Sequence, residues 1–234
     1  MEIEILTDAN AVAKRAAAVI AAEARGAVSA RGCFNFAVSG GHAPWIMLRN
    51  LAGEQVPWNE VQIFQIDERV APAGDPERNL THLRESLLQR VPLRIDQIHA
   101  MPVELPELDV AASQYAHTLQ EFAGDPPVLD LAHLGMGPDG HTASLVPGDP
   151  VLDVVDRDVA VTGVYMERRR MTLTYPMINR SRRILWLITG ADKLAALAKL
   201  RQGDTSIPAG RIRRENALLL AEQASAGASA ATRG

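Results

Sequence analysis

The stretch VLDLAHLGMG, residues 128–137, is a short apolar run that ends in glycines, as a buried strand leaving a sheet would. Three other stretches have the same form: FNFAVSGG (34–41), VQIFQIDE (61–68) and RILWLITG (183–190). Each ends in glycine or an acidic residue, and a helical pattern follows most of them. Strands that alternate with helices indicate βαβ units. We therefore predict an α/β fold with a largely parallel sheet flanked by helices on both faces.

The same patterns place the remaining elements and the domain limits. A further strand is expected at 3–6, and helices are expected at 8–25, 44–51, 79–89, 109–122 and 191–200. A chain of 234 residues can bury a substantial core as one domain. We predict a single domain over 1–224 and a disordered tail of small and polar residues at 225–234.

Composition narrows the possible partners and the cellular compartment. The net charge of -4 gives no basic surface for nucleic acid or for an anionic membrane. Cys33 is the single cysteine, so it has no partner for an internal disulfide, and no apolar run has the length of a membrane span. The N-terminal segment lacks a signal-peptide pattern. We expect a cytoplasmic monomer that binds neither nucleic acid nor membranes.

Ser39, Gly40 and Gly41 follow the apolar run FNFAV (34–38), and Pro44 marks the start of the next expected helix. Glycines let the backbone approach an anion, and a helix N-terminus offers unpaired N–H groups and a favourable dipole. The motif therefore favours phosphate binding. A simple tight turn between strand and helix would have the same sequence.

Two basic residues are candidates for the same anion. Lys193 is one of three lysines and lies in the first turn of an expected helix, where a cation opposes the helix dipole. A solvated ion pair with Asp192 is the alternative. Arg170 heads an alternating stretch and could bind phosphate through two N–H groups, although Arg168 and Arg169 could do the same or form a solvated charged run.

Acidic residues and a histidine end two other predicted strands. Asp67, Glu68 and Arg69 close one of them, at the edge of the sheet where ligands bind in open α/β folds. Asp139 and His141 follow another, in a loop whose glycines permit close approach to a ligand. An imidazole oriented by a carboxylate suits a general base. A surface or capping histidine is the alternative.

A metal site is not predicted from these residues. One histidine with scattered carboxylates matches no dedicated metal motif.

Six motifs resemble those of the 6-phosphogluconolactonase family and occur in the same order along the chain. They are SGG with Pro44 (39–44), DER with Pro72 (67–72), GMGPDGHTASLVP (135–147), RMTLTYPMIN (170–179), GADK (190–193) and PAGRI (208–212). The block DGHTASL, 139–145, is the most specific of them. The resemblance implies a Rossmann-like fold, no cofactor, and hydrolysis of 6-phospho-D-glucono-1,5-lactone to 6-phospho-D-gluconate in the pentose phosphate pathway.

The related glucosamine-6-phosphate deaminases and sugar-phosphate isomerases are the nearest alternative function. In the deaminases a glutamate that assists proton transfer follows the loop histidine by five residues, and Val146 stands at that position here. A noncatalytic sugar-phosphate sensor is a third possibility. The chain lacks the length and the basic helix-turn-helix region of a joined DNA-binding module. His42, Ala43 and Trp45 depart from the family pattern, which puts side-chain help to the phosphate there in doubt.

Roles follow for ten residues. The expected catalytic residues are His141 as the base, with either Asp139 or Asp67 as the group that orients it. The expected substrate-binding residues are Ser39, Gly40, Gly41, Glu68, Arg69, Arg170 and Lys193.

Overall fold

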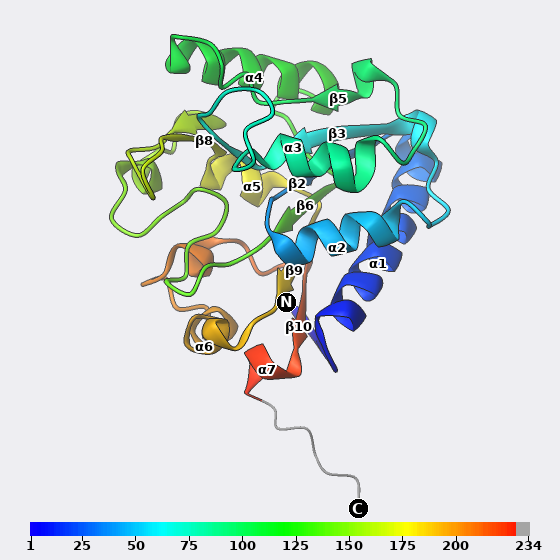
Figure 1. The fold of residues 1–234 in the computed structure, drawn as a ribbon, viewed down its shortest axis with the longest axis vertical. Coiled ribbons are helices and arrows are strands. Elements are labelled where there is room, and N and C mark those ends of the chain that lie inside the picture. Colours follow the sequence, from blue (N-terminus) through cyan, green and yellow to red (C-terminus); the bar gives the residue numbers. More distant parts are fainter. Residues whose placement is uncertain (228–234) are drawn as a thin grey trace, which may run out of the picture.

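Seven parallel strands form the central sheet, in the order β1-β10-β9-β6-β2-β3-β5 (Figure 1). A computed structural model describes residues 1–227 of the chain. The strands are β1 (Glu2–Leu6), β2 (Phe34–Val38), β3 (Val61–Gln65), β5 (Ile98–His99), β6 (Leu131–Leu134), β9 (Arg183–Ile188) and β10 (Ala217–Glu222). Every neighbouring pair is parallel, which confirms the predicted α/β fold.

Helices cover both faces of this sheet. They are α1 (Ala9–Arg31), α2 (His42–Leu51), α3 (Asn79–Leu83), α4 (Leu108–Ala123), α5 (Tyr175–Arg180), α6 (Leu194–Gln202) and α7 (Gln223–Ala226). Figure 1 shows α1 and α2 on one side of the sheet and α5 and α6 on the other.

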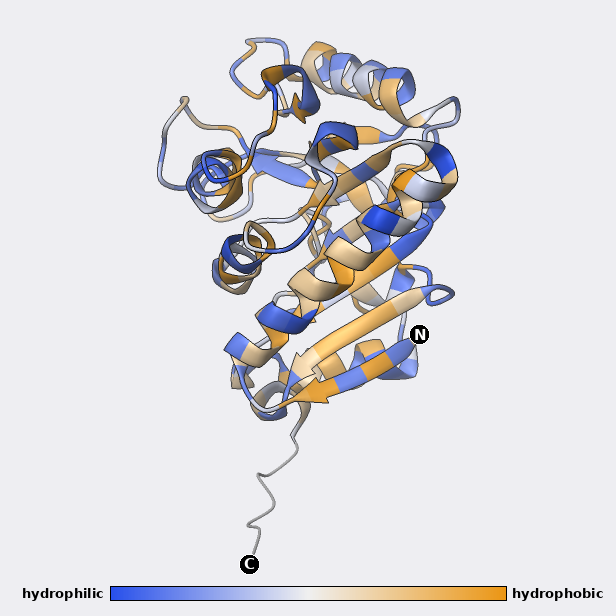
Figure 2. Cartoon of the chain, turned by 90° about the vertical axis from the view of Figure 1, so that its right-hand side faces the viewer, coloured by the Kyte–Doolittle hydropathy of each residue, from blue (hydrophilic) through white to orange (hydrophobic). Residues whose placement is uncertain are grey.

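Alternate residues of the inner strands pack against opposite layers, because successive side chains in a strand point to opposite faces. In the edge strand β1, by contrast, Ile3 and Ile5 are exposed. In β2, Phe36 packs in the core with Ile20 of α1 and Met47 of α2, whereas Ala37 packs in the core with Tyr115 of α4. Both faces of the sheet are therefore buried. In Figure 2 the strand beside the N-terminal one is mostly orange, whereas the edge strand β1, which starts at the N-terminus, alternates blue and orange.

The helices largely follow the sequence patterns. Asp8 caps α1 by accepting a hydrogen bond from the backbone N–H of Ala11 at 2.9 Å, but α1 continues past the expected end at Arg25 to Arg31. The buried face of the helix continues through Ala27, which explains the extension across Gly26. The helix expected at 79–89 becomes α3 followed by a π-helical turn at Arg84–Leu88.

A second, three-stranded antiparallel sheet lies beside the main one and was not predicted. It has the order β4-β8-β7, with β4 at Asp67–Arg69, β7 at Val159–Val161 and β8 at Arg170–Leu173. The chain leaves β3 and enters β4 after one residue, Ile66, so it passes from the main sheet directly into the small one. This crossing brings Asp67 and Arg69 beside β8.

The C-terminal end of the described chain is α7. The side chain of Ser225 is buried and its hydroxyl donates to the carbonyl of Ile188 at 3.1 Å, so the expected boundary at 224 falls inside this helix. The rest of the predicted tail, from residue 228, lies outside the described residues. Across residues 1–227, no helix combines the length and apolar character needed to cross a bilayer.

Candidate active site

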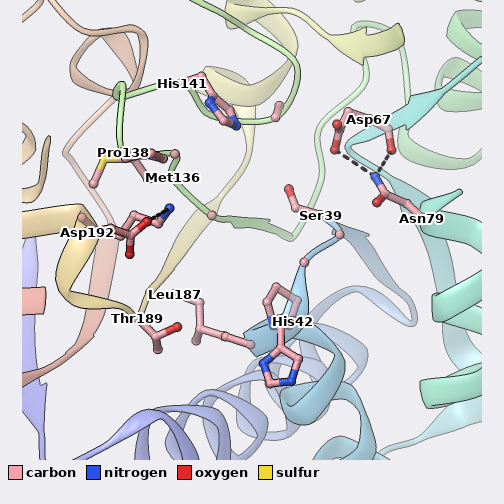
Figure 3. Close-up of a pocket in the computed structure, with 18 of the residues that line it drawn as sticks. Ser39, His42, Asp67, Asn79, Met136, Pro138, His141, Leu187, Thr189 and Asp192 are labelled. Atoms are coloured by element: carbon pink, nitrogen blue, oxygen red, sulfur yellow. Dashed lines mark hydrogen bonds and ion pairs between the residues drawn. The ribbon is translucent and has the colours of Figure 1, made fainter. Parts of the chain in front are cut away.

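A cavity of about 450 Å³ opens at the carboxyl edge of the main sheet, where the loops after β2, β6 and β9 meet the small sheet. Most predicted site residues line it: Ser39, Gly40, Gly41, Asp67, Arg69, His141, Arg170 and Lys193. Figure 3 shows His141 at one end of this space and His42 and Leu187 at the other. Asp139 and Glu68 do not line the cavity.

His141 is held by Asp139, as the sequence predicted for one of its two candidates. The imidazole Nδ1 lies 2.6 Å from Oδ1 of Asp139, and the backbone N–H of His141 donates to the same oxygen at 3.1 Å. Burial opposes ionisation of Asp139, but the hydrogen bonds and charge of His141 hold its pKa below the ordinary value. An ionised carboxylate only accepts, so Nδ1 carries the hydrogen, and in the neutral imidazole Nε2 has the lone pair.

Gly137 makes room for this pair. A Cβ atom at this position would lie 2.2 Å from Cε1 and Nδ1 of His141 and 2.6 Å from Oδ1 of Asp139. The imidazole therefore folds back against the backbone of its own loop, which explains one of the glycines that precede it.

Asp67 does not orient the imidazole, contrary to one of the sequence alternatives. Its carboxylate accepts hydrogen bonds from the hydroxyl of Ser144 at 2.7 Å and from the amide of Asn79 at 3.4 Å. Ser144 belongs to the loop of His141, and Asn79 begins α3. Asp67 thus joins that loop to α3 at the wall of the cavity.

The structure separates the three consecutive arginines. Arg168 forms ion pairs with Asp75, at 3.2 Å, and with Glu77, and Arg169 donates to the carbonyl of Thr162. Arg170 is 6% exposed and lines the cavity. Burial, followed by the charge of Arg69, lowers the pKa of Arg170.

Glu68, which we expected to contact the substrate, does not line the cavity. Successive residues of a strand face opposite ways, so Asp67 and Arg69 reach the cavity and Glu68 points into the protein. The carboxylate of Glu68 is fully buried. It accepts hydrogen bonds from the backbone of Arg69, Asn79 and Leu80 and from the side chain of Gln65, and it pairs with Arg78 at 3.1 Å. Its role in the described structure is to fix the start of α3.

The loop after β2 brings backbone and hydroxyl groups to the cavity. The helix α2 begins at His42, so Pro44 is its third residue rather than its first. The backbone N–H of Ser39 donates to Nδ1 of the buried His133 at 3.3 Å, and the hydroxyl of Ser39 has no hydrogen-bond partner among the described residues. Trp45 stacks on His82, with ring centroids 3.8 Å apart.

Lys193 reaches the cavity from the short turn Ala191–Lys193 after β9. Its ammonium group lies 2.8 Å from Oδ2 of Asp192. The ion pair considered from the sequence therefore forms, and both of its members line the cavity.

Four buried polar atoms of cavity-lining residues have no hydrogen-bond partner within the described chain. They are Oγ of Ser39, Oδ1 of Asn79 and the Nε atoms of Arg69 and Arg170. Leaving buried polar groups unpaired is costly. The hydroxyl of Ser39 and the guanidinium groups of Arg69 and Arg170 are hydrogen-bond donors among the lining side chains, so the cavity is suited to a ligand with several oxygen atoms. The same part of the chain, residues 1–227, contains no cluster of three or more His, Cys, Asp or Glu side chains that could hold a metal ion.

Comparison with known proteins identifies the family. A family model described as glucosamine-6-phosphate isomerases/6-phosphogluconolactonase matches residues 7–220. The chain belongs to this family. A 6-phosphogluconolactonase from Nostoc sp. is 34% identical over 97% of both chains. The crystal structure of a 6-phosphogluconolactonase from Thermotoga maritima superposes with a TM-score of 0.84 at 27% identity, over 94% of this chain and 98% of that one.

The glucosamine-6-phosphate isomerase/6-phosphogluconolactonase fold alone does not separate the activities within the family. A monomeric glucosamine-6-phosphate deaminase, 17% identical, also superposes with a TM-score of 0.84, over 98% of this chain and all of that one. Val146 does differ from the deaminase pattern: it is an aliphatic residue, 6% exposed, and it does not line the cavity. Hence this position supplies no second proton-transfer group.

Sequence reasoning missed two residues that shape this family member's site. Asn79 and Ser144 both bind Asp67 from elements far apart in the chain. Ser144 lies within the DGHTASL block, so the motif contained a signal for it. Asn79 had no comparable signal, because its contact depends on how α3 packs against β4.

Proposed function

We propose that the protein hydrolyses 6-phospho-D-glucono-1,5-lactone to 6-phospho-D-gluconate, the lactonase step of the oxidative pentose phosphate pathway. The observation that carries the proposal is the pair of His141 and Asp139, which leaves one imidazole nitrogen available at a cavity lined by the basic side chains of Arg69, Arg170 and Lys193. Lactonase relatives that match along nearly the whole chain support the same reaction.

In this proposal the phosphate is held by Ser39, Gly40, Gly41, Arg170 and Lys193. Arg170 and Lys193 supply positive charge, and the N-terminus of α2 adds backbone donors and a favourable dipole. Fixing the phosphate places C1 of the lactone beside His141. The phosphate acts as the point of attachment, which makes attack by water an oriented step.

His141 acts as the general base. Its Nε2 takes a proton from water as the water oxygen bonds to C1, and the carbonyl oxygen becomes the oxyanion of a tetrahedral intermediate. Asp139 stabilises the imidazolium that forms. The bond between C1 and the ring oxygen then breaks, and the imidazolium returns the proton to that oxygen. Asp67 positions the loop of the base through Ser144 rather than touching the imidazole.

Arg69 is the proposed donor to the oxyanion. The N–H groups of Gly137 and Gly140 already donate to carbonyls of their own loop, at 2.9 and 3.0 Å. The side chain of Arg69 lines the cavity, and its guanidinium has donors beyond the Nη1 group that binds the carbonyl of Glu77. One such donor is typically worth about 3 kcal/mol of transition-state stabilisation.

A coupled assay tests the proposal. The lactone is generated in situ from glucose 6-phosphate, and formation of 6-phosphogluconate is followed for wild type, for His141→Ala and without enzyme, because the lactone also opens spontaneously. We expect wild type to exceed the background and His141→Ala to lose about 10²–10⁴-fold in kcat. Calorimetry should show that the variant still binds 6-phosphogluconate. Equal rates for wild type and variant would remove His141 from the mechanism.

The same preparation distinguishes the alternative activities. A deaminase would release ammonia from glucosamine 6-phosphate, and a sensor would bind 6-phosphogluconate without accelerating lactone opening. The absence of a proton-transfer side chain at Val146 supports the lactonase over the deaminase.

The proposal includes a monomeric enzyme in the cytoplasm. The groups named in the mechanism all come from one chain, so a single copy contains the complete site. Light scattering at assay concentration tests the monomer, with a mass near 25.3 kDa expected.

A further inference from the structure

A tight hairpin at residues 161–170 extends toward the catalytic pair. At its tip, the backbone N–H groups of Tyr165 and Arg168 donate to each other's carbonyls, at 2.9 and 3.3 Å. The two residues between them, Met166 and Glu167, have φ values of 49° and 65°, as in a two-residue hairpin turn with both central residues left-handed. The ion pairs of Arg168 with Asp75 and Glu77 fasten this tip to the segment that precedes α3. The hairpin hydrogen bonds and the ion pairs of Arg168 therefore both restrict the position of Tyr165.

Tyr165 contacts three groups of the proposed mechanism. Its hydroxyl donates to Oδ2 of Asp139 at 3.4 Å, the carboxylate oxygen that His141 does not use. Its ring lies edge-on to the imidazole of His141, with centroids 5.7 Å apart. The guanidinium carbon of Arg170 lies 4.9 Å from the centroid of the same ring.

We propose that Tyr165 is a positioning residue that holds the Asp139–His141 pair in its working orientation and stabilises Arg170 for anion binding. This inference rests on the proposed lactonase function and extends it to a side chain outside the cavity wall.

The contact with Asp139 limits rotation of the pair. The carboxylate of Asp139 is 37% exposed, so without Tyr165 its second oxygen would bind water and the carboxylate could turn away from the imidazole. The Tyr165 hydroxyl and the Tyr165 ring restrain Asp139 and His141 at the same time. The restraint acts on the geometry of proton transfer, so it affects kcat more than substrate binding.

The contact between Tyr165 and Arg170 affects anion binding rather than proton transfer. A carboxylate beside Arg170 would compete with an anionic ligand for the guanidinium. The face of an aromatic ring attracts a cation without neutralising it. The ring of Tyr165 thus offsets part of the cost of burying Arg170 while its charge stays available to phosphate.

Two substitutions separate these contributions. Tyr165→Phe removes only the hydroxyl, and we expect kcat to fall about threefold to tenfold with the dissociation constant of 6-phosphogluconate unchanged. Tyr165→Leu also removes the ring, and we expect that dissociation constant to rise about threefold to tenfold as well. Val164→Ala is the matched control, because Val164 is 71% exposed in the same hairpin and should leave both quantities at the wild-type value.

A double-mutant cycle tests whether Tyr165 acts through Asp139. Tyr165→Phe should have no further effect on kcat in an Asp139→Ala background. A general structural role would lower kcat by the same factor in both backgrounds, and that result would overturn the proposal. Calorimetric stoichiometry near one site per chain excludes a fraction of unfolded protein as the cause of a lower kcat.

Failure of this proposal is distinguishable from failure of the lactonase function. If wild type does not accelerate lactone opening, the function fails, and binding of inorganic phosphate still tests the contact with Arg170. Wild-type phosphate affinity in Tyr165→Leu would overturn that contact. Wild-type kcat in Tyr165→Phe, with an active parent enzyme, would overturn the contact with Asp139.

Discussion

Arg69 and Arg170 lie directly opposite each other on the antiparallel strands β4 and β8, and both line the cavity. Like charges in this arrangement repel and destabilise a sheet. The ion pairs within residues 1–227 include neither guanidinium. The free protein therefore contains two facing cations, and an anionic ligand bound between them would reduce their repulsion.

Ligand-induced stabilisation measures this relief. At 6-phosphogluconate concentrations of about 100 times Kd, wild type should gain about 2.7 kcal/mol, which is about 5–10 °C in Tm for a chain of this length. Arg170→Met should retain less than half of this shift. Arg169→Met is the control, because Arg169 donates to the Thr162 carbonyl and does not line the cavity. An undiminished shift in Arg170→Met, measured by scanning fluorimetry, would remove Arg170 from phosphate binding.

The tautomer of His141 should depend on Asp139. In Asp139→Asn the amide can present its NH₂ group to Nδ1, which would place the ring proton on Nε2 and abolish the base. We expect kcat to fall about 10²–10⁴-fold with little change in the affinity for 6-phosphogluconate. A lowered affinity with normal kcat would instead assign Asp139 to substrate binding.

Two glycines of the same loop give a matched test of the geometry of the pair. Gly137→Ala places a Cβ atom in the position of the imidazole, so kcat should fall by about tenfold or more as His141 is displaced. Gly135→Ala introduces a Cβ atom with no other protein atom within 4 Å, so the pair should stay in place and kcat at saturating substrate should remain near the wild-type value, although Gly135 lines the cavity and KM can change. Steady-state kinetics of the two variants decide the point. Equal activities would mean that the pair tolerates displacement.

Glu68 should matter for stability rather than for binding. Glu68→Gln removes one of the two carboxylates that pair with the buried Arg78, because Glu104 remains 2.6 Å away, and it weakens the hydrogen bonds that the ionised carboxylate of Glu68 accepts. We expect a cost of about 1–3 kcal/mol. The control Glu77→Gln removes an exposed partner of Arg168 and should cost less than about 1 kcal/mol. Urea denaturation measures both. A weakened affinity for 6-phosphogluconate at unchanged stability would restore Glu68 to the substrate contacts.

Two buried histidines predict acid sensitivity of the fold. Burial lowers the pKa of His133 to about 3 and that of His99 to about 4, whereas the unfolded chain protonates histidine near pH 6.5. Between these values the unfolded state binds more protons, so stability falls as pH drops from about 6.5 toward 4.

Each histidine contributes up to about 1.4 kcal/mol per pH unit in that window. The loss between pH 7.5 and pH 5, measured by urea denaturation, should be smaller in His133→Leu than in wild type. His117→Ala, an exposed position, should leave the loss unchanged. An identical loss in His133→Leu would contradict the lowered pKa of His133.

The parallel sheet could be predicted because its strands carry their own signals. Residues such as Phe36 and Trp186 lie in runs that are apolar on both faces, and the glycines or acids after each run mark the carboxyl edge. The strand β10 was missed because its Ala and Leu residues are equally typical of a buried helix. The small sheet was missed because β4 has three residues and pairs with β8 about a hundred positions later.

Local sequence patterns likewise predicted some features of the site and missed those that depend on contacts between distant segments. His141 and Asp139 are two positions apart in a glycine-rich loop, so a local pattern was enough to pair them. Local pattern did not identify which arginine faces the cavity, because Arg168, Arg169 and Arg170 have the same chemistry in sequence. It likewise missed Tyr165, whose place at Asp139 depends on a hairpin fastened by residues near position 75.

The contact between Gly40 and Asn79 limits how this site can change during evolution. An added Cβ at Gly40 would lie 1.8 Å from Oδ1 of Asn79, so the amide occupies the space that any side chain at position 40 would need. A side chain at position 40 requires that Asn79 rotate away or be replaced by a smaller residue, and either change would remove the amide from Asp67. The two positions are therefore expected to vary together among descendants of this protein, through intermediates in which the cavity wall is already weakened.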